Sequence, residues 1–198
     1  MRRRRNTAVS PAGGVLLGLQ MSRVPGAARY RSASIVLHWL MFVLIACAYA
    51  FMEFRGQFPR GAERDAVKAL HYSFGLLVFV LVWARIALRL TETVRPIDPP
   101  LHPMVKLAAN GLHLSLYAFM IVMPVLGWAQ LSAKGASIAL LGLALPPLIA
   151  EDRELAYRLG DLHEWIGKAG YFLIALHIVA GLAHHFVRRD DTVTGILP

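Results

Sequence analysis

Four apolar stretches divide this chain, and each is long enough to cross a membrane as a helix. They cover residues 34–54, 70–90, 107–131 and 162–187. A helix needs about 20 apolar residues to cross a hydrocarbon core about 30 Å thick. Only helices and closed barrels satisfy their backbone hydrogen bonds there. Because 57% of the whole chain is hydrophobic, the pattern predicts an all-α protein, a transmembrane four-helix bundle with up-and-down topology.

The remaining residues suggest how the chain is divided. Residues 1–28 are basic at their start and rich in small and turn-forming residues, which predicts a disordered cytoplasmic extension. Translation can begin at Met1 or at Met21. Residues 29–198 are expected to form a single transmembrane domain. Within it, residues 136–150 are apolar but too short to cross the bilayer, so we expect a short interfacial segment there.

The charges indicate orientation rather than a nucleic-acid partner. The net charge is +9, and the excess of Lys and Arg lies in the N-terminal segment and beside one set of helix ends. Cytoplasmic loops carry such an excess, so both termini are predicted to be cytoplasmic. No nucleic-acid-binding module is recognisable. The single cysteine, Cys47, excludes a disulfide or a Cys-ligated cluster within one chain, which leaves histidine as the candidate metal ligand.

Four histidines fall at two matched depths in these helices. His163 and His177 are fourteen residues apart, which is about 21 Å along a helix and nearly four whole turns. They therefore share one helix face. The topology places His38 at the cytoplasmic depth of His177, and His71 at the outer depth of His163. A single membrane histidine can simply hydrogen-bond a neighbouring helix, but two matched pairs predict two b-type haems, each held by two imidazoles. Such iron suits one-electron transfer.

Two further histidines have no assigned partner. His113 and His184 lie near the cytoplasmic ends of their helices, and His184 follows His177 by seven residues on the same face. Each can bind a quinone headgroup, relay protons or extend to the membrane interface. The sequence does not separate these roles.

The sequence also resembles a known family. Several motifs carry the likeness, which covers nearly all of residues 29–198: Ser34–Trp39, Met52–Gly56, Leu70-His71, Gly111–Leu114, Gly170–Phe172 and Leu176–His185. With these motifs the chain resembles the bacterial cytochrome b-561 family of four-helix dihaem membrane proteins, and within that family the superoxide oxidase type. The resemblance implies the same haem ligands, His38 with His177 and His71 with His163.

The resemblance implies a location and an activity. It points to the bacterial inner membrane and to an oxidoreductase that passes electrons from superoxide, through two haems, to ubiquinone near His113 and His184. Superoxide, ubiquinone and the lipid bilayer would then be its partners. The alternative is a non-catalytic electron-transfer subunit that serves a redox protein partner, a periplasmic dehydrogenase or hydrogenase. In both cases the same histidine pairs would bind the two haems.

Overall fold

A computed structural model describes residues 32–92, 100–140 and 142–197. It contains four long helices: α1 (Ser32–Phe54), α2 (Ala62–Thr91), α3 (Pro103–Ala133) and α4 (Arg153–Ala183). A 3₁₀ turn (Arg55–Gln57) follows α1, and a π-helical turn (His184–Arg188) follows α4. All four helices are long and apolar enough to cross a membrane, which confirms the predicted fold class. The predicted disordered extension, residues 1–28, lies outside the described residues.

The helices are longer than the apolar stretches that predicted them. Helix α2 begins eight residues before the predicted stretch, with Glu63 and Asp65 in its first turn, where acidic side chains favour the helix dipole. Helix α4 begins nine residues early, and the side chain of its N-cap Asp152 accepts a hydrogen bond from the Leu155 amide at 3.0 Å. Both helices thus extend beyond the apolar stretch into polar residues, which the predicted spans did not include.

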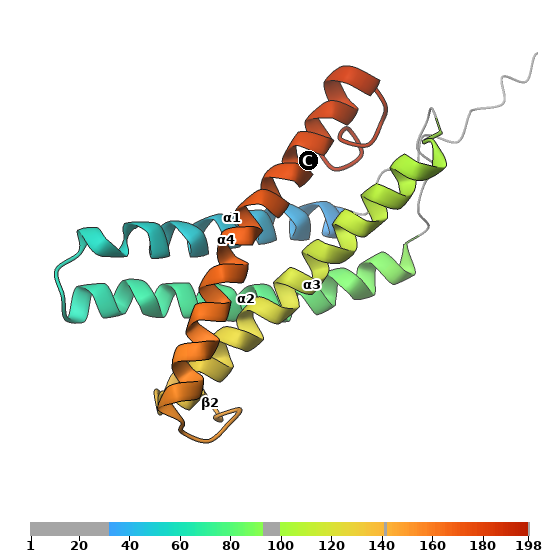
Figure 1. Ribbon diagram of the computed structural model, residues 1–198. Helices are drawn as coiled ribbons and strands as arrows, with labels where there is room; N and C mark the ends of the chain where they lie inside the picture. Colours follow the sequence, from blue (N-terminus) through green and yellow to red (C-terminus); the bar gives the residue numbers. More distant parts are fainter. Residues whose placement is uncertain (1–31, 93–99, 141, 198) are drawn as a thin grey trace, which may run out of the picture.

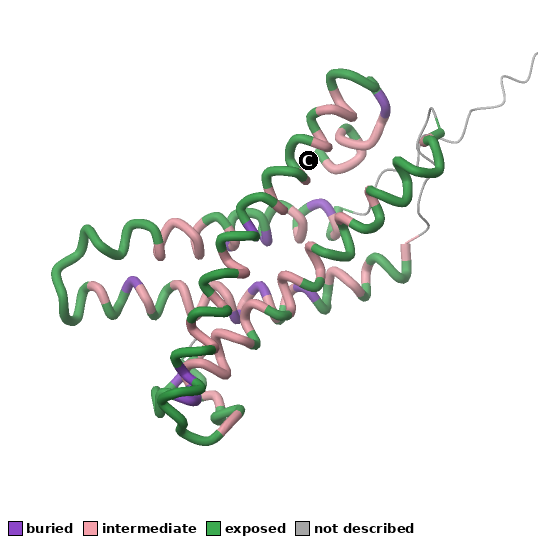
Figure 2. Tube along the Cα trace, in the orientation of Figure 1, coloured by how far each residue is buried: buried purple, intermediate pink, exposed green. Residues whose placement is uncertain are grey.

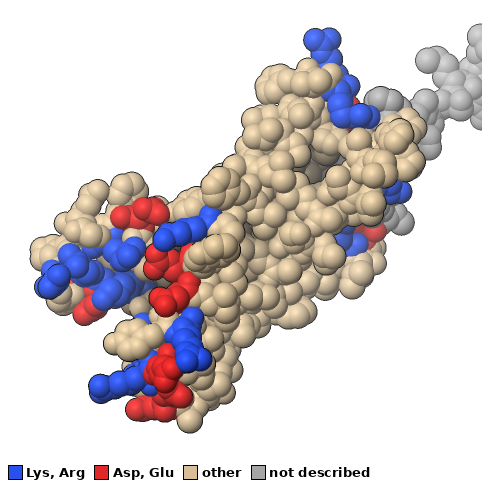
Figure 3. All heavy atoms as spheres, viewed as in Figure 1, with Lys and Arg blue, Asp and Glu red and all other residues tan. Residues whose placement is uncertain are grey.

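The helices form two antiparallel hairpins that cross each other, α1 with α2 and α3 with α4 (Figure 1). One end of the bundle, here called the terminal end, holds the start of α1 and the end of α4. The opposite end, the loop end, holds the α1–α2 and α3–α4 connections. Charged side chains gather at both ends of the face shown in Figure 3, with an uncharged band between them. That distribution suits a protein whose middle lies in lipid.

The hydrophobic core lies between three helices rather than four. Its buried centre consists of Met41 and Leu44 of α1 with Val78 and Val82 of α2, and Met120 of α3 packs against it. No α-carbon of α4 comes within 8 Å of one in α1 or α2 among the described residues. Packed helices usually have axes 8–10 Å apart, so α4 stands back from this core. Figure 2 shows exposed and intermediate residues along all four helices and buried residues at only a few positions, a pattern that suits a bundle surrounded by lipid.

The segment between α3 and α4 is a β-hairpin. Strands β1 (Ile138–Leu140) and β2 (Leu143–Leu145) pair antiparallel, with Ile138 opposite Leu145. Gly142 has φ +86° at the turn, a conformation that glycine adopts without strain. The Trp128 indole donates a hydrogen bond to the Pro146 carbonyl at 3.0 Å, which fixes the hairpin against the end of α3. The sequence predicted an interfacial segment here but not its strands.

Candidate histidine sites between the helices

The structure brings four of the predicted histidines together in two pairs. At the loop end, His71 of α2 and His163 of α4 have ring centroids 6.1 Å apart. At the terminal end, His38 of α1 and His177 of α4 have centroids 6.3 Å apart. These are the pairs expected from helix depth. Each pair spans the gap between α4 and the α1–α2 hairpin.

The separation within each pair suits two ligands of one metal atom. A bond from a metal to an imidazole nitrogen is about 2 Å long, and that nitrogen lies about 1.1 Å from its ring centroid. Two imidazoles on opposite sides of one metal therefore have centroids about 6.2 Å apart. His113 of α3 also lies beside His177, with centroids 5.5 Å apart, which is shorter than this separation. The terminal-end geometry therefore favours His38 over His113 as the partner of His177.

The rest of each ligand set must come from a bound group. Among the described residues, no three side chains of His, Cys, Asp or Glu come together to hold a metal ion. Two facing imidazoles would supply two ligands of a metal. A haem would bring the remaining nitrogen ligands itself, so the donor set fits that group.

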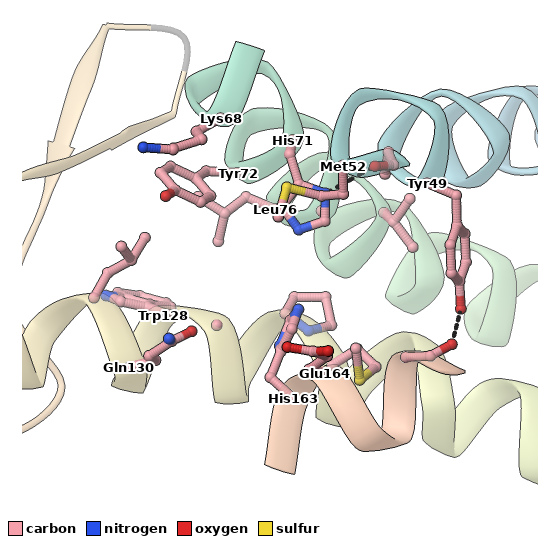
Figure 4. A pocket seen from close by; sticks show the side chains of 18 of the residues that line it. Tyr49, Met52, Lys68, His71, Tyr72, Leu76, Trp128, Gln130, His163 and Glu164 are labelled. Atoms are coloured by element: carbon pink, nitrogen blue, oxygen red, sulfur yellow. Dashed lines mark hydrogen bonds between the residues drawn. The ribbon is translucent and has the colours of Figure 1, made fainter. Parts of the chain in front are cut away.

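A cavity of about 610 Å³ surrounds the loop-end pair. Its volume lies within the range of about 300–1,000 Å³ that is typical of cofactor sites. His71 and His163 project into it from α2 and α4 (Figure 4). The Nδ1 atom of His71 lies 2.9 Å from the Ala48 carbonyl. Because a carbonyl only accepts, Nδ1 carries the proton and Nε2 keeps its lone pair. Histidines that bind metals are commonly held by such a bond.

His163 has a different environment. Its Nδ1 atom is buried and makes no hydrogen bond of ordinary geometry with the described residues, although the Met123 backbone lies near the ring. Gly127 of α3 lies directly against the ring, since a Cβ at this position would be 3.2 Å from Cε1 of His163. On the other side of the cavity, a Cβ at Gly75 would have nothing within 4 Å. Gly127 therefore makes room for the ligand ring, and Gly75 leaves open space in the cavity.

Aromatic side chains fill the region between the two pairs. Gly170 is midway between His163 and His177 on α4, and its face is covered by Tyr49 and Phe119. The Tyr49 hydroxyl donates to the Gly167 carbonyl at 2.7 Å (Figure 4). Because Gly170 has no side chain, the aromatic rings of α1 and α3 can pack directly against α4 at this position. Tyr49 was not predicted from the sequence, although it follows His38 by eleven residues, or about three helical turns.

The terminal end is hollowed between α3 and α4 (Figure 3). The C-terminal segment folds back beside this hollow, and the Trp39 indole donates to the Ile196 carbonyl at 2.8 Å. Arg85 of α2 donates to the Ser34 carbonyl of α1 at 3.2 Å. His38 thus has a neighbour, Trp39, that fastens the C-terminal segment to α1.

His184 lies in the π-helical turn and contacts a residue that the sequence did not single out. Its Nδ1 atom is 2.6 Å from Oδ2 of Asp190, whose side chain is fully buried. Burial of the Asp190 carboxyl raises its pKa, but hydrogen bonds from Thr192, His184 and Arg188 outweigh this and lower the pKa to about 2. Asp190 is therefore a carboxylate at neutral pH. No sequence signal could reveal this contact, because it depends on a reversal of the chain at Arg189.

The family model described as prokaryotic cytochrome b561 matches residues 29–198. The chain belongs to the prokaryotic cytochrome b561 family. It is therefore a multi-pass membrane protein of a family that binds haem b and transfers electrons.

Curated members of the cytochrome b561 family cover most of the chain. Cytochrome b561 homolog 1 of Escherichia coli K12 is 33% identical over 171 residues, which is 86% of this chain and 97% of that protein. A Yersinia pestis protein named probable superoxide oxidase CybB is 33% identical over 86% of this chain and 96% of its own. Cytochrome b561 homolog 2 of E. coli is 27% identical over 85% of this chain and 91% of its own.

Proposed function

We propose that this cytochrome b561 is a dihaem superoxide:ubiquinone oxidoreductase of the bacterial inner membrane. The observation that carries the proposal is the placement of two facing histidine pairs at opposite ends of one helix, α4. His38 and His177 would hold one haem b, and His71 and His163 the other. Haem b held by two imidazoles supplies reversible one-electron chemistry at an iron with no open position for oxygen.

The reaction balances as two one-electron oxidations and one two-electron reduction. Two superoxide anions would be oxidised to two molecules of dioxygen. The two electrons, with two protons, would reduce one ubiquinone to ubiquinol. The matched pairs are about 21 Å apart along α4, from the helical rise between His163 and His177. Electrons entering at one end of the bundle would therefore leave near the other.

The loop-end cavity offers an entrance for an anion. Four cationic side chains line it, and the carboxylates among the lining residues are Glu53 and Glu164. The cations are Arg55, Lys68, Lys134 and Lys168. Glu53 accepts a hydrogen bond from the Tyr171 hydroxyl at 2.6 Å, which disperses part of its charge. A local positive excess beside a redox site raises the encounter rate with a small anion.

Lys134 is the best candidate among these cations for steering superoxide. Lys68 pairs with Asp65 at 2.8 Å and Lys168 pairs with Glu164 at 2.7 Å. Neither Lys134 nor Arg55 has an ion pair among the described residues, but the Arg55 guanidinium donates to the Met52 carbonyl and acts electrostatically on Glu164. Of the four positive charges, that of Lys134 is therefore the least neutralised by nearby groups.

The orientation and the exit site complete the proposal. With the terminal end in the cytoplasm, superoxide would arrive from the periplasm and ubiquinone would bind near His113 and His184. His113 is exposed on α3 beside His177, and His184 lies beyond His177 on α4. Both positions suit a quinone headgroup that enters from the lipid.

The test is to mix purified, haem-loaded protein with superoxide and then with ubiquinone, and to follow the haem spectrum. We expect superoxide to reduce the haem and ubiquinone to reoxidise it. Lys134→Gln should slow reduction by superoxide and weaken its salt dependence. Lys106→Gln, on the same helix at the opposite end, should not. Normal haem spectra with no reduction by superoxide would contradict the enzyme and favour the electron-transfer subunit.

A further inference from the structure

The chain reverses sharply where α4 ends. The π-helical turn His184–Arg188 is followed by Arg189 in the left-handed conformation, with φ 56° and ψ 39°. The Asp190 amide then donates to the His184 carbonyl at 3.3 Å, and this bond closes the reversal. A residue other than glycine rarely adopts this conformation. Its use here brings the Asp190 side chain back against His184.

Asp190 is held by donors on both carboxylate oxygens. Oδ2 accepts from Nδ1 of His184 at 2.6 Å and from Nε of Arg188 at 3.2 Å. Oδ1 accepts from the Thr192 amide at 3.1 Å. The carboxylate side chain is fully buried, whereas the His184 side chain is 12% exposed. A buried charge is costly unless it is paired in this way, and here the pairing fixes the plane of the His184 ring.

The contact leaves one nitrogen of His184 available. The hydrogen bonds of its side chain with the described residues all go through Nδ1, and 12% of the side chain is exposed. Nε2 therefore has no hydrogen-bond partner among the described residues at the terminal end. His184 is seven residues beyond His177, about 10 Å along the helix and on the same face. The bond from Trp39 to Ile196 fastens the folded segment to α1 beside His38.

We infer that Asp190 is a positioning residue that orients His184 as the proton donor to the bound quinone. This inference rests on the proposed function. With Nδ1–H held by the carboxylate, the imidazolium form of His184 can release only the proton on Nε2. That proton would form an O–H bond on the quinone as an electron arrives, which leaves His184 neutral, and a proton taken up from solvent at the bundle end would restore the imidazolium. Two electrons and two such protons convert the quinone to the quinol. The arrangement resembles other histidines whose ring is aimed by a buried carboxylate.

The test compares Asp190→Asn with Asp190→Glu in the full-length, haem-loaded protein. Two rates are measured separately: reduction of the haem by superoxide, and reoxidation of the haem by ubiquinone. Asp190→Asn should leave the first rate unchanged and lower the kcat of the second at least tenfold, with KM within twofold. It should also change the solvent deuterium isotope effect on that step. Asp190→Glu keeps the charge, so its rate of haem reoxidation should lie between those of the unmodified protein and Asp190→Asn. Glu63→Gln, an exposed carboxylate at the loop end, serves as control.

The outcomes separate the inference from the function that it rests on. If the unmodified protein does not pass electrons to ubiquinone, the proposed function fails. If it does, and Asp190→Asn reoxidises at the unmodified rate, the positioning role is overturned. If Asp190→Asn loses haem, Asp190→Glu is compared with the unmodified protein. Slower reoxidation with unchanged reduction by superoxide then supports the role, and equal rates overturn it.

Discussion

Gly127 offers a sharp test of the loop-end site, because adding one methyl group there affects helix stability and ligand geometry in opposite directions. Alanine in place of glycine inside a helix stabilises the helix by about 0.5–1 kcal/mol. The new Cβ, however, would lie 3.2 Å from Cε1 and 3.5 Å from Nδ1 of His163. Carbon atoms in good contact are about 3.5–4.0 Å apart, so the His163 ring must shift by at least about 0.3 Å.

That shift is large for a metal ligand. Metal–ligand distances hold to within about 0.2 Å, and loss of support around a ligand typically lowers metal affinity about 10–100-fold. We therefore expect Gly127→Ala to weaken the loop-end haem selectively. Gly111→Ala on the same helix is the matched control, because a Cβ at Gly111 has nothing within 4 Å. It should gain the helix stability and keep both haems.

The assay is the haem-to-protein ratio of purified variants, followed by redox titration of the remaining haem. Gly127→Ala should lose the loop-end haem on dilution or detergent washing, or show a shifted potential for it, with the other haem unchanged. Equal retention and equal potentials in Gly127→Ala and Gly111→Ala would refute the packing argument.

Three further predictions follow from the same contacts. His71→Ala or His163→Ala should remove one haem and leave the terminal-end haem in place, as measured by reduced-minus-oxidised spectra; loss of both, or of the other one, would contradict the pairing. Gly170→Ala should lower the free energy of unfolding by about 1–3 kcal/mol through overpacking, because a Cβ there would lie 2.5 Å from Phe119. Gly181→Ala should not, because its Cβ would have its nearest neighbour at an ordinary 3.9 Å. Thermal denaturation of the two variants measures the difference. Because the pKa of Asp190 is lowered from 3.8 to about 2, the ionised carboxylate stabilises the folded C-terminal segment above about pH 4, and this stabilisation is lost as the pH falls toward about 2. Limited proteolysis with an acid-active protease should therefore release the segment between these pH values. Asp190→Asn should release it at higher pH as well.

The fold and the pairing of the histidines could be predicted because both follow from fixed helix geometry. Apolar length defines a span, and a constant rise per residue converts sequence position into depth. His163 and His177 therefore had to lie at different depths. Two more helices then had to supply His71 and His38 at those depths.

Other features depend on contacts that no local pattern encodes. The hairpin at 138–145 was missed because its strands are three residues each and read as one apolar run. The role of Gly170 depends on which aromatic side chains reach it from α1 and α3. The contact between Asp190 and His184 requires a π-helical turn and a left-handed Arg189. Sequence spacing carries no sign of that reversal.

The two facing histidine pairs are tested most directly by the haem content and axial ligation of the purified protein after expression with ample haem. A pyridine haemochrome assay counts the haems per chain, and electron paramagnetic resonance reports the axial ligands. We expect two haems b per chain, both low-spin with two histidine ligands, and loss of only one of them in His163→Ala. A single haem, or a high-spin haem with one histidine ligand, would contradict the two facing pairs along α4.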